Sequence, residues 1–317
     1  MAGPLKPGPE AVLCRSYARP PNISLDRTPA NFAERGGGGG RIWEGGCKAA
    51  SRMLPFPFDL VRDMEDRMGE DDRLALVTGT SSGLGIAIAK VLLENGWTVV
   101  GISRRNVQLG HPHYEHIQLD LADTQRLDEI SRIRLAPTLR DSRWQRVGLV
   151  NNAGVAAAML PLESIDLGSL ARSFAVNAAA PIYLMGLVVR ETSLDTQLRI
   201  VNLSTGAAVQ PFPGLADYGS SKAALRQASL MFAAELASTE RAGGPRLNAS
   251  IMSYSPGTVD TPMQETARSA DHAWFKLFRD IHSQGLLVAA DEPAAEVVEF
   301  LGGESHDPFV EKRFGTP

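Results

Sequence analysis

Three closely spaced glycines directly after a short apolar run constrain the fold of this chain more than any other feature. The run is Leu74 to Val77, and it continues into Thr78-Gly79-Thr80-Ser81-Ser82-Gly83-Leu84-Gly85. An apolar run of this length suits a parallel strand that is buried on both faces. The residues after Gly83 have helical apolar spacing up to Gly96. A strand, a glycine turn and a helix in this order predict a turn whose backbone N–H groups bind a phosphate.

The same alternation continues along the chain and predicts the fold class. Further apolar runs with strand character lie at residues 98–102, 116–119, 147–150, 199–203 and 248–253, and segments with helical spacing separate them. Alternating strands and helices are typical of an α/β protein with a doubly wound, Rossmann-like parallel sheet. We therefore predict one such domain over residues 72–317.

The first 67 residues differ from the rest in composition. They contain the glycine run at residues 36–40, scattered prolines and many arginines, without a lasting helical or strand period. Such a segment buries too little apolar surface to offset its chain entropy. We predict a disordered, low-complexity extension over residues 1–67. An arginine-rich organelle leader and a later start at Met64 or Met68 are the alternatives.

Composition narrows the partners and the location. The chain has 317 residues and a formal net charge of −4, which gives no reason to expect nucleic acid or an anionic membrane as partner. No run approaches the roughly 20 apolar residues that span a bilayer. The only cysteines, Cys14 and Cys47, precede the predicted domain, and a cytoplasmic location fits this usage. His111, His113 and His116 are close in sequence, but we interpret them as a solvated loop and expect no metal.

The glycine turn and the end of the second strand predict the cofactor. Gly79 permits the tight turn, Gly83 lets the backbone approach a pyrophosphate, and Gly85 allows close packing of helix on strand. The contacts to the cofactor are then expected from Gly79, Ser81, Ser82, Gly83, Leu84 and Gly85. Arg104 and Arg105 follow the second strand, where an NAD site would place a carboxylate. Two arginines instead offer forked donors to a 2′-phosphate, which predicts NADP(H). The alternative is a solvated arginine pair.

Later motifs follow in the order of one known family. They are Asn151-Asn152-Ala153-Gly154, Asn177, Tyr218-Gly219-Ser220-Ser221-Lys222 and Pro256-Gly257-Thr258-Val259-Asp260-Thr261. Together with the glycine turn, these motifs make residues 72–302 resemble the classical short-chain dehydrogenase/reductase family. The resemblance implies further cofactor contacts from Asn151, Ala153, Gly154, Tyr218, Lys222, Pro256, Gly257, Val259 and Thr261.

Tyr218 and Lys222 carry the expected chemistry. They are four residues apart, so on a helix they share one face. The charges of a lysine ammonium and of oxidised nicotinamide should lower a tyrosine pKa that is otherwise near 10. Tyr218 could then donate a proton to a carbonyl oxygen as hydride arrives. The resemblance implies that Lys222 also binds the nicotinamide ribose and that Asn177 orders a water for proton relay.

Two assignments stay open at the level of sequence. Asp120, after the third strand, either accepts from the adenine amino group or caps the next helix. The family places a serine thirteen positions before the tyrosine, where this chain has Thr205, and Ser204 stands one position earlier. Successive side chains at a strand end point to opposite faces, so only one of the two hydroxyls should assist Tyr218. The unbroken spacing favours Thr205.

Within the family, three stretches resemble sepiapterin reductases and the benzil reductases that form (S)-benzoin. They are residues 102–105, 210–214 and 259–264. An aspartate that anchors the pterin in sepiapterin reductases has no confident match in the tail at 309–314, which favours the benzil-reductase type. We expect NADPH-dependent reduction of a ketone, with one carbonyl of a vicinal diketone as the leading substrate. Sepiapterin-type, acyl-carrier and steroid ketones are the alternative substrates. The non-enzymatic alternative is a binding protein that senses NADPH. The family also implies a homo-dimer or homo-tetramer.

Overall fold

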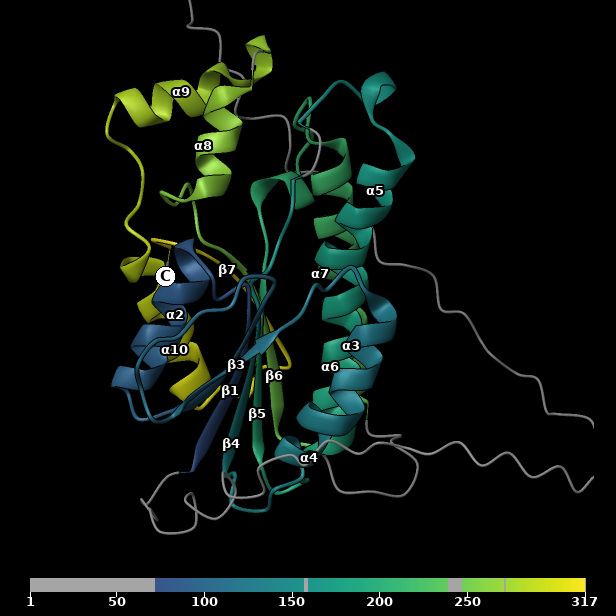
Figure 1. Ribbon diagram of the computed structural model, residues 1–317, viewed down its shortest axis with the longest axis vertical. Coiled ribbons are helices and arrows are strands. Elements are labelled where there is room, and N and C mark those ends of the chain that lie inside the picture. The colour runs from purple at the N-terminus through teal and green to yellow at the C-terminus, as the bar shows by residue number, and fades with distance from the viewer. Residues whose placement is uncertain (1–71, 157–158, 239–246, 271, 317) are drawn as a thin grey trace, which may run out of the picture. The chain divides into compact units, whose positions relative to one another are not determined.

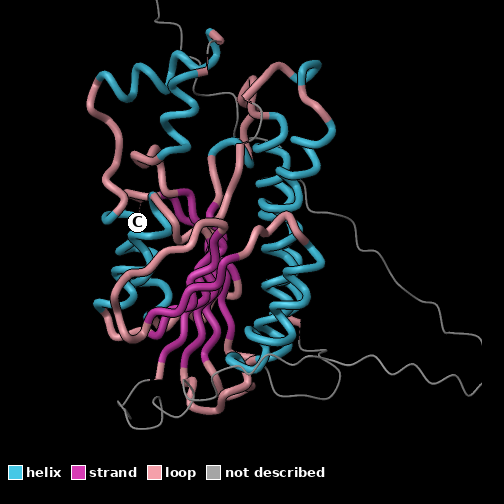
Figure 2. Tube along the Cα trace, in the orientation of Figure 1, coloured by secondary structure: helices cyan, strands magenta, loops and turns pink. Residues whose placement is uncertain are grey.

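The computed structural model describes residues 72–156, 159–238, 247–270 and 272–316. The predicted extension, residues 1–67, lies outside these ranges. Within them, one sheet stands between two layers of helices (Figure 1). The strands form a single central layer with helical coils on both of its sides (Figure 2).

The sheet contains seven parallel strands in the order β3-β2-β1-β4-β5-β6-β7. Their bounds are β1 Arg73–Thr78, β2 Thr98–Ser103, β3 Tyr114–Gln118, β4 Arg146–Asn151, β5 Gln197–Leu203, β6 Ala249–Ser255 and β7 Phe309–Arg313. The chain leaves β1 toward β2 on one side and returns to pair β4 on the other. This reversal between β1 and β4 is the switch point of a doubly wound sheet, so the predicted fold class is confirmed.

The predicted strands match the structure to within two residues at each end, and the two strands considered next are edge strands. The third strand begins at Tyr114 rather than His116 and ends at Gln118, one residue before Leu119. The seventh strand, Phe309–Arg313, was not predicted as a strand. Each has only one neighbour in the sheet. Polar side chains are tolerated there, so the apolar run that marks a doubly buried strand is missing.

Helices cover both faces of the sheet. One face is covered by α2 (Gly83–Glu94) and α10 (Asp291–Gly302), and the other by α3 (Thr124–Ile130), α4 (Ala136–Leu139), α6 (Ala180–Glu191) and α7 (Ala216–Ala237). α5 (Leu167–Phe174) precedes α6, and π-helical turns lie at η2 (Ser131–Leu135) and η4 (Ala175–Ala179). Beyond the sheet lie α8 (Pro262–Ser269) and α9 (Lys276–Ser283). Short 3-10 turns are η3 (Leu162–Ser164), η5 (Gly206–Ala208) and η6 (Ala273–Phe275).

The central strands are continuous apolar runs in the sequence because both of their faces are buried in the core. Leu74 and Leu76 of β1 face the α3–α7 side, whereas Ala75 and Val77 face the α2–α10 side, and all four are fully buried. Burying a side chain of the size of leucine or valine contributes about 1.5–3 kcal/mol. A polar residue at any of these positions would lose that contribution on one of the two faces.

One helical stretch is longer and more apolar than sequence inspection suggested. Residues 167–191 run through α5, η4 and α6 and are long and apolar enough to cross a membrane by length and composition. In the fold, 56% of the most apolar window is buried inside the protein. Leu184 and Val188, both fully buried, pack in the main core cluster. The apolarity of this stretch therefore serves packing against the sheet.

Ionic contacts on both faces hold the C-terminal strand β7 in place. On one face, Glu311 accepts from the Nε and Nη2 atoms of Arg226 on α7 at 2.6 and 2.7 Å. On the other face, the neighbouring Lys312 lies 3.3 Å from Glu296 of α10. The buried Tyr254 hydroxyl donates to the same Glu296 at 3.0 Å. The tail thus joins α7 to α10 at the edge of the sheet.

Candidate active site

The glycine turn has the geometry that its sequence predicts. Gly79 and Gly83 have φ values of +78° and +56°, a region that other residues rarely adopt. A Cβ on Gly79 would lie 2.7 Å from Asn152 Nδ2, and a Cβ on Gly85 would collide with the Gly79 carbonyl. A Cβ on Gly83 would meet the Thr261 methyl at 2.9 Å. Each glycine therefore fills a position where a side chain has no room.

The loop after β4 is fastened to the start of the glycine turn. The Thr78 hydroxyl accepts from the backbone N–H groups of Asn152 and Ala153, both at 3.0 Å. In return, Asn152 Nδ2 donates to the Thr78 carbonyl at 2.8 Å. These bonds hold the two loops together at the switch point of the sheet. Neither Thr78 nor Asn152 was singled out from sequence, although Asn152 lies inside a recognised motif.

The N-terminus of α2 is suited to an anion. Ser82 is the N-cap residue, yet its side chain does not cap the helix, and the first turn carries no acidic residue. Arg105 reaches over from the end of β2, and its Nη2 donates to the hydroxyls of Ser81 and Ser82 at 3.1 and 3.0 Å. Helix N–H groups and a guanidinium at one place favour negative charge. The residues present thus fit the phosphates of a dinucleotide.

Tyr218 and Lys222 lie on α7, as predicted, and Thr205 joins them. Thr205, which follows β5, interacts through its side chain with the Tyr218 phenol and lowers the pKa of that phenol. The Lys222 ammonium is 2% exposed and donates to the Leu203 carbonyl at 2.7 Å. A tyrosine hydroxyl, a second hydroxyl and an ammonium therefore meet at the carboxyl end of β5.

The pKa values at this site differ from the sequence-based expectation. Burial raises the pKa of Tyr218 to about 12, and the hydrogen bond from Thr205 opposes this increase. Burial also lowers the pKa of Lys222 to about 8. The expected lowering by Lys222 together with oxidised nicotinamide stays a prediction, because without the cofactor the pKa of Tyr218 is raised. The physical reason is that desolvation of the phenol dominates, while Lys222 is directed to a backbone carbonyl.

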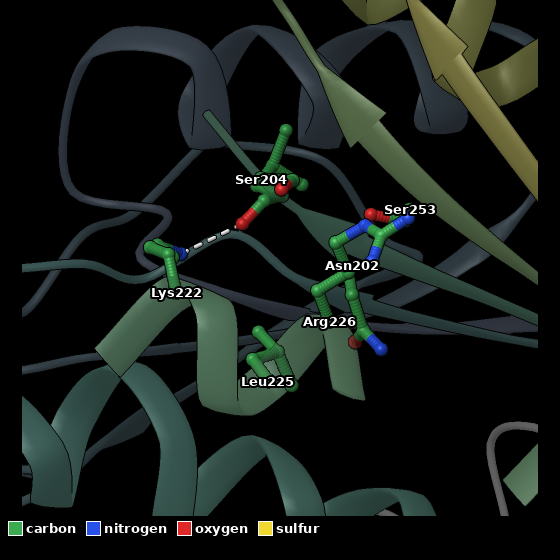
Figure 3. Close-up of a pocket in the computed structure, with 7 residues that line it drawn as sticks. Asn202, Ser204, Lys222, Leu225, Arg226 and Ser253 are labelled. Carbon is green, nitrogen blue, oxygen red and sulfur yellow. Dashed lines mark hydrogen bonds between the residues drawn. The ribbon is translucent and has the colours of Figure 1, made fainter. Parts of the chain in front are cut away.

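Ser204 and Thr205 occupy different surroundings. Ser204 lines a small hollow together with Lys222, Arg226 and Ser253, behind the hydrogen bond from Lys222 to Leu203 (Figure 3). Its backbone N–H donates to the Tyr254 carbonyl of β6 at 2.7 Å. Thr205 has the side-chain hydrogen bond to Tyr218 instead. Both residues follow the end of β5, and which hydroxyl assists Tyr218 stays a prediction.

Asn177 lies in the π-helical turn η4 and binds the loop after β4. Its Oδ1 accepts from the Val155 N–H at 2.8 Å, and its Nδ2 donates to the Val155 carbonyl at 2.7 Å. The same Nδ2 donates to the Ser221 hydroxyl at 2.9 Å, one residue before Lys222. A π-helical turn inside a longer helix often marks a functional position. Here it brings a buried amide between the loop and α7.

Two predicted residues have side-chain partners other than those expected. Asn151 is 1% exposed and donates to Asn202 Oδ1 at 2.8 Å, so its amide lies in the core. Asp120 accepts from Arg172 Nη2 at 2.8 Å and from the Ala122 N–H at 3.0 Å. Burial raises the pKa of Asp120, but the Arg172 hydrogen bond and charge outweigh this and lower it overall. The alternative of a helix cap is wrong, because Asp123, three residues later, caps α3.

The remaining predicted residues surround the same region. Thr261 caps α8 through its hydroxyl, and its methyl lies beside Gly83. A Cβ on Gly154 would lie 3.8 Å from Lys222 Nζ and 3.6 Å from Asn177 Oδ1, so this glycine lies directly beside both groups. Val259 pairs with Val288 in an isolated bridge, and Gly257 has a φ of +75°. Of the other predicted residues, Leu84 lies in the first turn of α2, and Arg104, Ala153 and Pro256 follow β2, β4 and β6 in turn.

The comparisons with known proteins point to one family. The family described as short chain dehydrogenase matches residues 73–272. A benzil reductase ((S)-benzoin forming) of Bacillus subtilis is 31% identical over 232 residues, which cover 72% of this chain and 93% of the relative. A benzil reductase of the same description from Bacillus cereus is 30% identical over 244 residues, covering 73% of this chain and 95% of the relative.

A solved structure gives the same result. The crystal structure of a short-chain dehydrogenase/reductase from Burkholderia vietnamiensis is 30% identical to this chain, with a TM-score of 0.53. The match covers 65% of this chain and 95% of the other. The relatives therefore correspond to the described domain rather than to the preceding residues.

The buried Lys222 predicts how stability depends on pH. Its folded pKa of about 8 lies below its usual 10.5, so the unfolded chain binds more protons between these values. The free energy of unfolding should therefore rise with pH over this window, by up to about 3 kcal/mol. Lys222→Met should remove this rise. We expect chemical denaturation between pH 8 and 10 to show a steeper increase for the wild type.

Lys90→Met is the matched control, because Lys90 is an exposed lysine on α2. It should reproduce the wild-type dependence on pH. Parallel curves for the wild type and Lys222→Met would contradict the assignment of a strongly desolvated ammonium.

Proposed function

The chain belongs to the short-chain dehydrogenase family, and on that basis we propose that it reduces a ketone with NADPH. The family makes it an oxidoreductase that acts on alcohol or ketone groups of small molecules. The finer proposal is that Tyr218 donates the proton, that the cofactor is NADPH rather than NADH, and that the substrate is a vicinal diketone. The observation that carries it is the meeting of Thr205, Tyr218 and Lys222 at the carboxyl end of β5.

The proposed chemistry assigns each side chain one task. NADPH, when bound, supplies the hydride that attacks the carbonyl carbon. Tyr218 donates its proton to the carbonyl oxygen, so that the ketone becomes an alcohol. A tyrosine pKa raised to about 12 keeps the phenol protonated and ready to donate at neutral pH. Thr205 orients the phenol through their hydrogen bond, and Lys222 supplies positive charge as the phenolate forms.

The cofactor preference rests on Arg105. Its guanidinium lies over the turn that would bind the pyrophosphate, within hydrogen-bond distance of Ser81 and Ser82. A 2′-phosphate could replace these neutral hydroxyls as the acceptor, and a charge-assisted bond of this kind is about twice as strong. Arg104, beside it, adds positive charge, and Asp120 is held by Arg172. This arrangement supports NADPH as the preferred cofactor.

The substrate class rests on the relatives and on apolar side chains near Tyr218. Both named relatives are described as benzil reductases. Phe275, fully buried, packs with Leu215 and Met159 in a separate apolar cluster that includes residues of the segment just before Tyr218. Phe212 and Trp274 are partly exposed at 38% and 44%. An aromatic 1,2-diketone offers flat apolar rings that such surfaces could contact.

An NADPH-binding protein without catalysis is the second candidate from a different class. Against it stands the presence of both Tyr218 and Lys222, because a protein that only binds the cofactor needs no proton donor for a carbonyl oxygen. Among enzymes, reduction of pterin, acyl-carrier or steroid ketones uses the same groups. These substrates differ in size and polarity, so a substrate panel separates them.

The proposal also includes assembly and location. We propose a homo-dimer or homo-tetramer in the cytoplasm. Exposed apolar side chains on α5 and α6 support self-association, because Leu167 is 79% exposed, Phe174 37% and Ile182 41%. Exposed apolar groups that recur on adjacent helices favour a protein interface.

Turnover of a ketone panel tests the substrate class. With NADPH, benzil should be reduced at one carbonyl to a hydroxyketone, faster than monoketones of similar size. Oxidation of NADPH at about 340 nm and chromatography of the product measure this, and Tyr218→Phe provides the inactive control. Good turnover of an unrelated ketone with none of any 1,2-diketone would overturn the substrate class. NADPH binding without turnover of any ketone would favour the binding-protein alternative.

The cofactor preference is tested by Arg105→Ala. Losing a charge-assisted contact to the 2′-phosphate should lower the specificity constant for NADPH about tenfold or more and leave that for NADH nearly unchanged. Steady-state kinetics with both cofactors measure this. Arg132→Ala, at an exposed arginine of η2, is the control and should alter neither. A wild type that prefers NADH would refute the proposed cofactor.

The hydroxyl that assists Tyr218 is tested by two adjacent substitutions. Thr205→Val should reduce kcat about a hundredfold, the loss expected for one catalytic hydrogen-bond donor. Because the Thr205 hydrogen bond lowers the pKa of Tyr218, its removal should also shift the alkaline dependence of alcohol oxidation to higher pH. Ser204→Ala should have little effect on either. The reverse ranking of the two variants would show that Ser204 is the active hydroxyl.

A further inference from the structure

A closed ring of hydrogen bonds connects the glycine turn, the edge strand β3 and the loop that carries Arg105. Its members are Thr80, Tyr114, His116, Ser103, Arg105 and Ser81. The ring returns to its start because Ser81 directly follows Thr80 in the chain. Sequence inspection left His116 as part of a solvated histidine loop. The structure instead gives it two polar neighbours beneath the proposed 2′-phosphate site.

The first half of the ring depends on a missing side chain. Tyr114 of β3 donates its hydroxyl proton to the fully buried Thr80 at 3.3 Å. The phenol passes over Gly101 of β2, where any Cβ would collide with the Tyr114 hydroxyl and lie 2.8 Å from Thr80 Oγ1. The glycine in the middle of β2 therefore opens the path from the edge strand to the glycine turn.

The second half of the ring runs through the imidazole. His116 Nδ1 lies 3.1 Å from the Tyr114 hydroxyl, and Nε2 lies 3.5 Å from the Ser103 hydroxyl. Ser103 in turn donates to the Arg105 carbonyl at 2.8 Å. The Arg105 side chain completes the ring by donating to Ser81 and also to Ser82. Arg105 is therefore held in two ways. Ser103 binds its backbone carbonyl, and Ser81 and Ser82 accept from its side chain.

We propose that His116 is a positioning residue for cofactor selectivity, which holds Arg105 over the turn so that it reads a 2′-phosphate. This inference rests on the proposed preference for NADPH. His116 acts through Ser103 and the Arg105 backbone and does not itself touch the cofactor. It therefore contributes to the discrimination between a 2′-phosphate and a 2′-hydroxyl, rather than to binding of the adenosine or the pyrophosphate.

The ring accepts either charge state of the imidazole. When His116 is neutral, Tyr114 donates to Nδ1 instead of to Thr80, the Thr80 hydroxyl can donate to Tyr114 in return, and Nε2–H donates to Ser103. When it is protonated, Nδ1–H donates to Tyr114, whose proton then goes to Thr80 as drawn. Burial lowers the pKa of His116 below its usual value of 6.5, although hydrogen bonds to the Arg105 and Ser103 carbonyls oppose this. A neutral ring at pH 7 would therefore gain a proton when a phosphate dianion arrives.

The charges around His116 favour this response. Tyr114 stays a neutral phenol, because burial raises its pKa. Arg104 and Arg105 follow β2, the strand that pairs with β3. The nearest carboxylates in the chain are engaged with other groups, since Glu115 pairs with Arg134 and Asp120 with Arg172. A bound 2′-phosphate is then the negative charge that can raise the His116 pKa.

Two ligands that differ only in the 2′-phosphate test the inference without catalysis. Isothermal titration with 2′,5′-ADP and with 5′-AMP should give a wild-type preference for 2′,5′-ADP. His116→Phe keeps a ring of similar shape and removes both nitrogens. It should reduce the affinity for 2′,5′-ADP about tenfold and leave that for 5′-AMP unchanged. At pH 7, titration in two buffers should also show greater proton uptake with 2′,5′-ADP for the wild type than for His116→Phe.

A second variant and a control keep the experiment decisive. Tyr114→Phe removes only the hydroxyl at another link of the ring and should cause a similar selective loss, even if His116→Phe fails to fold. His113→Phe, at an exposed histidine just before β3, should behave as the wild type. Equal losses for both ligands would show a merely structural role, and unchanged selectivity would overturn the inference. A wild type without preference for 2′,5′-ADP would overturn the proposed cofactor together with the inference.

Discussion

The hydrogen bonds of the Thr78 hydroxyl are the interaction on which the site most depends. That hydroxyl accepts two backbone N–H groups of the loop after β4, and Asn152 returns a bond to the Thr78 carbonyl. A parallel sheet brings the ends of β1 and β4 side by side, but it leaves the loops beyond them free to diverge. The hydrogen bonds of Thr78 hold the two loops together. Glycine at 79 and 85 is then required, because the fastened loop occupies the space of any side chain there.

Burial of Lys222 is the second constraint, and it links stability to function. An ammonium with 2% exposure is unfavourable in the core, and its bond to the Leu203 carbonyl compensates only part of the desolvation. The fold tolerates this cost where α7 is fixed from both sides. Asn177 binds Ser221 from the π-helical turn, and Glu311 of β7 binds Arg226 one turn further along. A helix held in this way keeps Tyr218 and Lys222 in one orientation.

The sequence predicted the central strands and the main site motifs because each leaves a local signal. A strand buried on both faces, such as β1 or β5, must be apolar throughout, and a turn with positive φ at Gly79 needs glycine. The edge strands β3 and β7 carry no such signal, so one was misplaced by two residues at its start and the other was missed. Side-chain partners were least predictable. Nothing local indicates that Asn151 faces Asn202 or that Asp120 pairs with Arg172, since both contacts join residues about fifty positions apart.

The edge strand also shows why polar residues there can matter more than apolar ones. The interior strands have two neighbours and two covered faces, so their side chains are fixed by packing. β3 has one neighbour, and the side chains of Tyr114 and His116 are only partly buried. They reach inward over Gly101 toward Thr80 and Ser103. A glycine in a strand interior weakens the strand, and it is retained where another group must approach closely. Gly101 therefore weakens β2, but it also leaves the space through which Tyr114 of the edge strand β3 reaches Thr80 in the cofactor turn.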